Sequence, residues 1–155
     1  LITTDPGYAS AIGIAPAITP ERLRGIVLVS GAFDIAEIRT DGPYGWFIQT
    51  VLWAYSGARD FMNDPRFMLA SIPQHVTAAF PPAFISSGNG DPLAPQAERL
   101  AARLTELSVR VDSLFFPADF TPTLPHEYQF NLDTEAGAQS FARLNAFLRG
   151  VLGSD

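Results

Sequence analysis

The chain has 155 residues, a hydrophobic fraction of 47% and a net charge of −6. This length and composition predict one globular domain with a single core and exclude a disordered chain. An acidic chain without a cluster of Lys and Arg argues against binding to nucleic acid. Cysteine is absent, which excludes disulfides, thiolate metal sites and a cysteine nucleophile.

The longest apolar run, near Gly25 to Phe33, is too short to span a bilayer. We therefore expect no membrane span and assign a cytoplasmic location. The chain opens on Leu1-Ile2-Thr3-Thr4-Asp5, without Met or the pattern of a signal peptide. We interpret it as a fragment of a longer protein, with processing as the alternative.

The first predicted strand follows a short N-terminal helical segment. Residues 1–14 predict a helix and then a turn at Gly13, and a proline-containing loop comes next. Gly25–Ser30 is a run of mostly β-branched, uncharged residues. Such a run predicts a strand buried on both faces, which is typical of a parallel sheet with helices on each side.

Residues 37–80 are rich in aromatic side chains and show no strand pattern. Short helices are predicted at Trp46–Tyr55 and Pro65–Ala70, and the whole stretch is longer than an ordinary crossover between strands. It is either a cap over an apolar substrate pocket or a set of irregular crossover helices whose aromatics belong to the core. Under the first interpretation, the substrate-binding residues are Trp46, Phe47, Trp53 and Tyr55.

The stretch Pro81–Leu93 reads PPAFISSGNGDPL and organises the rest of the chain. Its apolar run, Ala83–Ile85, ends in a glycine-rich turn and then in a carboxylate, Asp91. The length of the run, its flanking prolines and its turn residues favour a strand over a helix. An acid at the carboxyl end of a parallel strand lies where open α/β sheets place their chemistry.

Two helices and one more strand are predicted after this turn. The first helix runs from about Ala94 to Leu107, with an apolar face at helical spacing, and a strand is predicted at Val109–Phe116. A proline-rich loop then carries His126. The last helix, about Glu135 to Leu152, has a capping threonine before it and a glycine after it. Its predicted apolar stripe is Phe141, Leu144, Leu148 and Val151.

Asp91 and His126 are the candidate catalytic residues. Each is on a loop after a strand, in the chain order of the second and third members of a Ser–Asp–His relay. The first member is missing, because no serine in the chain has the Gly-x-Ser-x-Gly pattern. Ser30 comes closest by position, but Leu28 stands where a glycine is needed.

Other interpretations of these residues remain open at this point. Asp91 could be only a turn-forming residue, and His126 only a surface histidine. His75 is a rival base, but it precedes the acid strand, and Asp34 is expected to cap a helix. The sequence shows no metal-ligand spacing and no phosphate or dinucleotide loop, so we expect neither a metal nor a cofactor.

The segment Gly88–Leu93, the helix and strand that follow it, and His126 before the last helix resemble the C-terminal part of the α/β-hydrolases. The nearest branch is the hormone-sensitive-lipase-like esterases and lipases, in which a strand ends in an acid followed by Pro-Leu. The resemblance covers about Gly25 to Leu152. Family members often carry His-Gly-Phe at the histidine loop, where this chain has His126-Glu127-Tyr128.

The resemblance implies a three-layer α/β/α fold with parallel strands, in which residues 1–155 form a single partial domain and about 37–80 form a cap or crossover region. It also implies serine hydrolysis of a carboxylic ester, and the aromatic cap favours a small apolar ester with short to medium acyl or aryl groups. His126 would take the proton of the serine, and Asp91 would orient the imidazole. Without the serine, the fragment itself is expected to be inactive.

One expectation concerns the edge of the predicted sheet, and another concerns an alternative function. The first strand would have an open edge, through which the isolated chain is expected to self-associate. The alternative function is a catalytically dead α/β-hydrolase-like binding or interaction module, which would hold a small apolar ligand or a partner with its aromatic cap.

Overall fold

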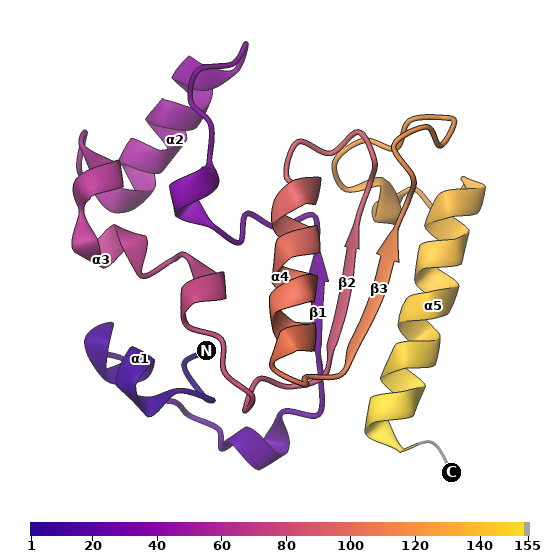
Figure 1. The fold of residues 1–155 in the computed structure, drawn as a ribbon, viewed down its shortest axis with the longest axis horizontal. Coiled ribbons are helices and arrows are strands. Elements are labelled where there is room, and N and C mark those ends of the chain that lie inside the picture. Colours follow the sequence, from indigo (N-terminus) through magenta and orange to yellow (C-terminus); the bar gives the residue numbers. More distant parts are fainter. Residues whose placement is uncertain (154–155) are drawn as a thin grey trace.

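A computed structural model describes residues 1–153 as a mixed α/β fold built on a small parallel sheet (Figure 1). The sheet consists of β1 (Ile26–Val29), β2 (Ala83–Ser87) and β3 (Val111–Phe115), in that spatial order. All three strands predicted from the sequence are present. Because every pairing is parallel, the carboxyl ends of the strands lie at one edge of the sheet.

The register of the sheet aligns the central residues of the three strands. Leu28 of β1 pairs with Ile85 of β2, which in turn pairs with Ser113 of β3. This alignment places Ser30, just after β1, beside the end of β2, where its backbone N–H donates to the carbonyl of Ser86 at 3.0 Å.

The helices of the structure confirm most of the helical segments predicted from the sequence. In the described part of the chain they are α1 (Pro6–Ala11), α2 (Gly45–Ser56), α3 (Pro65–Met68), α4 (Ala94–Glu106) and α5 (Glu135–Leu152). Short 3₁₀ turns lie at Pro20–Arg22, Ile35–Glu37, Phe61–Asn63, Ile72–Gln74 and Tyr128–Phe130. None of the helices within residues 1–153 combines the length and the apolar character that crossing a membrane requires.

The ends of α5 follow the signals read from the sequence. The hydroxyl of Thr134 accepts a hydrogen bond from the N–H of Gly137 at 3.1 Å, and so caps the first turn. Gly153 ends the helix with a φ of 68°, a left-handed conformation that costs glycine little.

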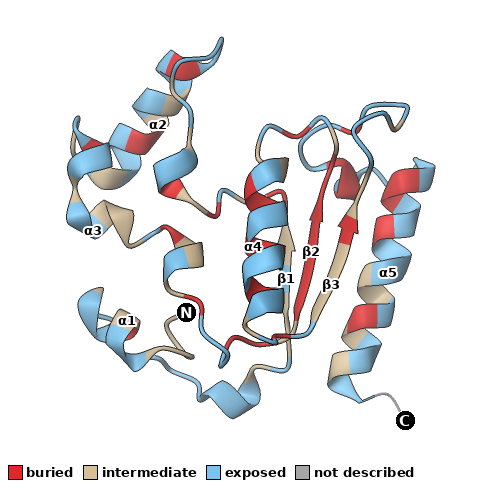
Figure 2. Cartoon of the chain, in the orientation of Figure 1, coloured by how far each residue is buried: buried red, intermediate tan, exposed pale blue. Residues whose placement is uncertain are grey.

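β2 is the centre of the core, and its side chains point alternately to two helices. Ala83 and Ile85 are fully buried in one cluster with Leu100 of α4. Phe84 points the other way, with its ring 6.0 Å from that of Phe147 in α5. The helices α4 and α5 thus cover opposite faces of β2, which is buried along its whole length (Figure 2).

The prediction that β1 is buried on both faces was wrong. Val27 is 38% exposed, and in the part of the chain that is described β1 pairs with β2 alone. The reason is that α5 packs mainly over β2 and β3, against Phe84 and Leu114; on that face of β1 it reaches Val29 but leaves Val27 exposed.

The apolar stripe predicted for α5 also needs correction. Phe141 is 52% exposed, whereas Phe147, which the stripe omitted, is 1% exposed and packs against β2. Leu144, Leu148 and Val151 are partly buried, as the stripe required. Phe141 lies on the side of the helix that faces the uncovered strand, where it lines a groove together with Val27.

The aromatic region between β1 and β2 is an excursion of the chain away from the sheet, and its two ends lie close together. The N–H of Ile72 donates to the carbonyl of Phe33 at 2.8 Å, which closes the excursion. The excursion carries α2 and α3, which lie off to one side of the sheet (Figure 1). Val76 and Phe80, near the end of the predicted cap region 37–80, belong instead to the main core.

Candidate active site

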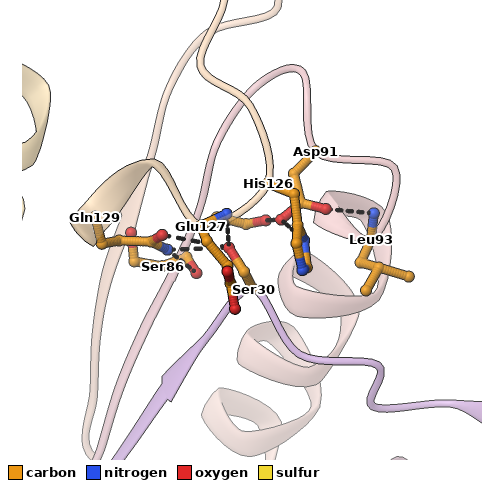
Figure 3. Close-up of polar contacts among 8 residues, drawn as sticks. Ser30, Ser86, Asp91, Leu93, His126, Glu127 and Gln129 are labelled. Carbon is orange, nitrogen blue, oxygen red and sulfur yellow. Dashed lines mark hydrogen bonds and ion pairs between the residues drawn. The ribbon is translucent and has the colours of Figure 1, made fainter. Parts of the chain in front are cut away.

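The structure brings together the two side chains predicted to act as acid and base. Asp91 lies just after the glycine turn that follows β2, and His126 lies on the loop that follows β3. The imidazole Nδ1 of His126 is 3.0 Å from the carboxylate Oδ2 of Asp91 (Figure 3). Neither element alone positions the pair, because 35 residues separate its members.

Both carboxylate oxygens of Asp91 have hydrogen-bond partners. Oδ1 accepts from the backbone N–H of Leu93 at 2.8 Å, and Oδ2 accepts from the hydroxyl of Ser87 at 2.9 Å as well as from His126. Burial by itself would raise the pKa of Asp91. The hydrogen bonds from Leu93, His126 and Ser87 help to outweigh this effect, and the pKa of Asp91 lies below the ordinary value.

The ionised carboxylate determines which nitrogen of His126 carries a proton. A carboxylate can only accept hydrogen bonds, so Nδ1 must be the donor. The neutral ring then has its free lone pair on Nε2, the atom that a general base uses. The side chain of Asp91 is fully buried, whereas that of His126 is 44% exposed, so the basic end of the pair is accessible.

The glycine turn and the histidine loop are locked to each other by backbone contacts. A Cβ at Gly88 would collide with the carbonyl oxygens of Leu124 and Pro125, so only glycine fits there. The N–H of Gly90 donates to the carbonyl of Leu124 at 2.9 Å. Asn89, between the two glycines, accepts from the N–H of Leu124 at 2.8 Å through Oδ1.

The amide nitrogen of Asn89 extends this lock by donating to the carbonyl of Phe120 at 3.0 Å. This role of Asn89 could not be predicted from the sequence. Its only local signal was its position between two glycines, which indicates a turn and not the loop that the turn contacts.

A second polar layer lies beneath the histidine loop, at the ends of β1 and β2. Ser86 shares a 2.7 Å hydrogen bond with the hydroxyl of Tyr128 and donates to the carbonyl of Leu114 at 3.0 Å. Gln129 donates to the carbonyl of Ser86 at 3.1 Å. Within residues 1–153 every buried side-chain nitrogen and oxygen has a hydrogen-bond partner, so this layer is fully satisfied.

The structure supplies no serine to act on His126. Among the described residues, no serine hydroxyl is hydrogen-bonded to the imidazole, and the hydroxyl of Ser30, the nearest candidate by sequence, bonds instead to the N–H of Glu127.

The four aromatics predicted to bind substrate lie on α2 and are exposed. Trp46 and Trp53 line a cleft of about 300 Å³, where the guanidinium of Arg59 sits 4.4 Å from the centre of the Trp53 ring. Neither Asp91 nor His126 lines this cleft. The remaining two, Phe47 and Tyr55, are 53% and 83% exposed. A substrate role for these residues stays a prediction.

A different cleft, of about 380 Å³, adjoins the acid turn. It lies between the aromatic excursion and the start of α4, and Ile38, Ile48 and Leu93 contribute apolar side chains to it. Pro92, the neighbour of Asp91, is also part of its lining. Ile38 and Ile48 could not be predicted as part of this cleft, because only the path of residues 37–80 in space brings them close to the turn.

The rival residues have structural roles. The ring of His75 packs against that of Tyr8, with centroids 4.9 Å apart. Asp34 accepts from the N–H of Ala36 and so caps a 3₁₀ turn, as expected. Asp112 pairs with Arg143 at 2.7 Å. In the described residues, no three His, Cys, Asp or Glu side chains gather closely enough to hold a metal ion.

Comparisons with known proteins do not identify a family for this chain. A scan of family models, a search of curated proteins and a search of solved structures gave no match to this chain.

Proposed function

We propose that this chain carries the acid and the base of a serine-type carboxylic-ester hydrolase, and that its fold is the C-terminal part of a three-layer α/β-hydrolase domain. The observation that carries the proposal is the 3.0 Å contact between a buried, ionised Asp91 and a half-exposed His126. In this reaction the nucleophilic serine attacks the ester carbonyl, and Nε2 of His126 takes its proton.

In the same proposal Asp91 acts through the imidazole. It holds the tautomer with the proton on Nδ1 and stabilises the imidazolium that forms when the serine loses its proton. The imidazolium then returns the proton to the leaving alcohol. The cleft beside Pro92 and Leu93 has an apolar part, formed with Ile38 and Ile48, that suits a small acyl or aryl group, while Glu37, Arg39 and Arg99 make the rest of its lining charged.

In this proposal the nucleophilic serine lies on a further strand that pairs with the open edge of β1. A strand added parallel to β1 would end at the same edge of the sheet as Asp91 and His126, where a nucleophile is needed. The apolar groove beside this edge, lined by Val27, Phe130 and Phe141, would be covered by the same addition. Self-association of the chain alone through this edge stays a prediction, which sedimentation analysis can test.

The proposal is tested by comparing this chain with the protein translated from the complete reading frame. We expect the latter to contain a Gly-x-Ser-x-Gly segment, to hydrolyse p-nitrophenyl butyrate and to be labelled by a fluorophosphonate on that serine. The chain alone should neither hydrolyse the ester nor be labelled by the probe. A complete protein that lacks the serine segment and resists the probe would favour the alternative, a binding module that uses the exposed aromatics of α2.

A further inference from the structure

Ser30 has an unusual backbone for its place in the sheet. It directly follows β1, is 7% exposed and has a φ of 47°. This left-handed conformation is unfavourable for a residue with a Cβ and persists only where the surroundings hold it. The contacts that hold Ser30 are therefore informative.

Those contacts come from the segment that follows the histidine. The hydroxyl oxygen of Ser30 accepts from the backbone N–H of Glu127 at 3.1 Å and from the side-chain amide of Gln129 at 3.2 Å (Figure 3). Gln129 is itself 8% exposed and is anchored on the carbonyl of Ser86. The end of β1 is thus tied to residues nearly a hundred positions later in the chain.

Glu127 is the residue at which the chain turns after His126. Its φ of 60° and ψ of 26° are left-handed, and a 3₁₀ turn begins at the next residue. Because its N–H is bonded to the Ser30 hydroxyl, that hydroxyl fixes the direction of the backbone on the C-terminal side of the imidazole. On the N-terminal side, the lock between Asn89 and Leu124 does the same.

We infer that Ser30 is a positioning residue, whose hydroxyl, supported by Gln129, holds the loop after His126 so that Nδ1 meets the carboxylate of Asp91. This inference rests on the proposed function for its catalytic meaning, but its geometry stands without a nucleophile. The hydroxyl of Ser30 also donates to the side-chain oxygen of Gln129 at 3.3 Å, so the contact between these two side chains is reciprocal. The charged groups at this point are Asp91, beneath the ring, and Glu127, on the exposed side of the loop.

The test is nitrogen-15 and proton NMR of histidine-labelled chain, with wild type and variants recorded under the same conditions at about pH 9. In the wild type, His126 should give a slowly exchanging, low-field Nδ1–H signal and nitrogen shifts of a single tautomer. Asp91→Asn should abolish both, which assigns the signal. Ser30→Ala should leave the far-ultraviolet circular dichroism unchanged but broaden or lose the Nδ1–H signal and mix the tautomers.

Two further variants separate the hydroxyl from the backbone. Ser30→Gly removes the hydroxyl but favours the left-handed φ, so it should behave like Ser30→Ala; it is also the variant to use if alanine prevents folding. Ser113→Ala, in the middle of β3, is the matched control and should keep the wild-type spectrum. A wild-type Nδ1–H signal in a folded Ser30→Ala or Ser30→Gly chain would overturn the inference.

Kinetics of the complete protein keep this inference distinct from the proposed function. If both hold, Ser30→Ala should lower kcat by up to about 10²-fold with KM little changed, because a misplaced base affects the chemical step. A complete protein without esterase activity, but with the predicted NMR changes, would refute the hydrolase and leave the positioning role intact. Normal kcat in Ser30→Ala would refute the positioning role alone.

Discussion

The carboxylate of Asp91 is completely hidden from solvent, yet it lies 3.0 Å from the imidazole of His126, which is 44% exposed. A buried carboxylate that orients an accessible imidazole is the arrangement that the proposed proton transfer would use. The pair depends on the glycine turn after β2 and on the histidine loop after β3.

The lowered pKa of Asp91 predicts how its contribution to stability depends on pH. Because folding lowers this pKa, the ionised carboxylate favours the folded state above the ordinary value of about 4, and the contribution is lost as the pH falls through the folded-state pKa. The difference in unfolding free energy between wild type and Asp91→Asn should therefore shrink below about pH 4. Urea unfolding at a series of pH values measures it, and a difference that grows on acidification would contradict the account.

Asn89 should hold the histidine loop in place. Asn89→Ala removes the bonds to the N–H of Leu124 and the carbonyl of Phe120, and should lower the unfolding free energy by about 1–3 kcal/mol. Hydrogen exchange of the loop amides should accelerate as well. Asn63→Ala, which removes an exposed amide bonded only to Asp60, is the control and should change stability by less than about 0.5 kcal/mol. Equal effects of the two variants would argue against the lock.

Gly88 should tolerate no side chain. In Gly88→Ala the new methyl group would press on backbone oxygens of Leu124 and Pro125, which cannot rotate away, so we expect a loss of about 1–3 kcal/mol or more. A Cβ at Gly42 meets nothing within 4 Å, and Gly42→Ala should change stability by less than about 1 kcal/mol. Thermal unfolding of the two variants tests the close approach, and a Gly88→Ala chain as stable as wild type would exclude it.

Phe147 should be the anchor of α5, in place of Phe141. Phe147→Ala removes a ring that is 1% exposed and packs on Phe84, so it should cost about 3–5 kcal/mol. Phe141→Ala, at a side chain that is 52% exposed, should cost about 0.5 kcal/mol or less. Denaturant unfolding separates them, and a larger loss for Phe141→Ala would restore the stripe predicted from the sequence.

How far the sequence predicts this molecule depends on how local each signal is. The face of α4 with Leu100 and the cap at Thr134 were predictable, because the residues that define them are neighbours along one helix. The periodicity of α5 could not show that its neighbours leave Phe141 uncovered, since that depends on where the helix lies on the sheet. The continuous apolar run likewise could not show that Val27 of β1 is exposed, since that also depends on where α5 lies.

The candidate site divides in the same way. Asp91 and His126 were predictable from their positions after strands and from their order in the chain. The support from Ser30 and Gln129 was not, because their contact joins residues 99 positions apart and leaves no local pattern.

The most direct test of the central claim is the steady-state hydrolysis of p-nitrophenyl butyrate by the complete protein carrying His126→Ala. We predict a loss of kcat of about 10⁴-fold or more with an unchanged circular dichroism spectrum. His75→Ala, which changes a ring packed on Tyr8, should retain activity. Turnover at the wild-type rate by a folded His126→Ala protein would contradict the assignment of His126 as the base.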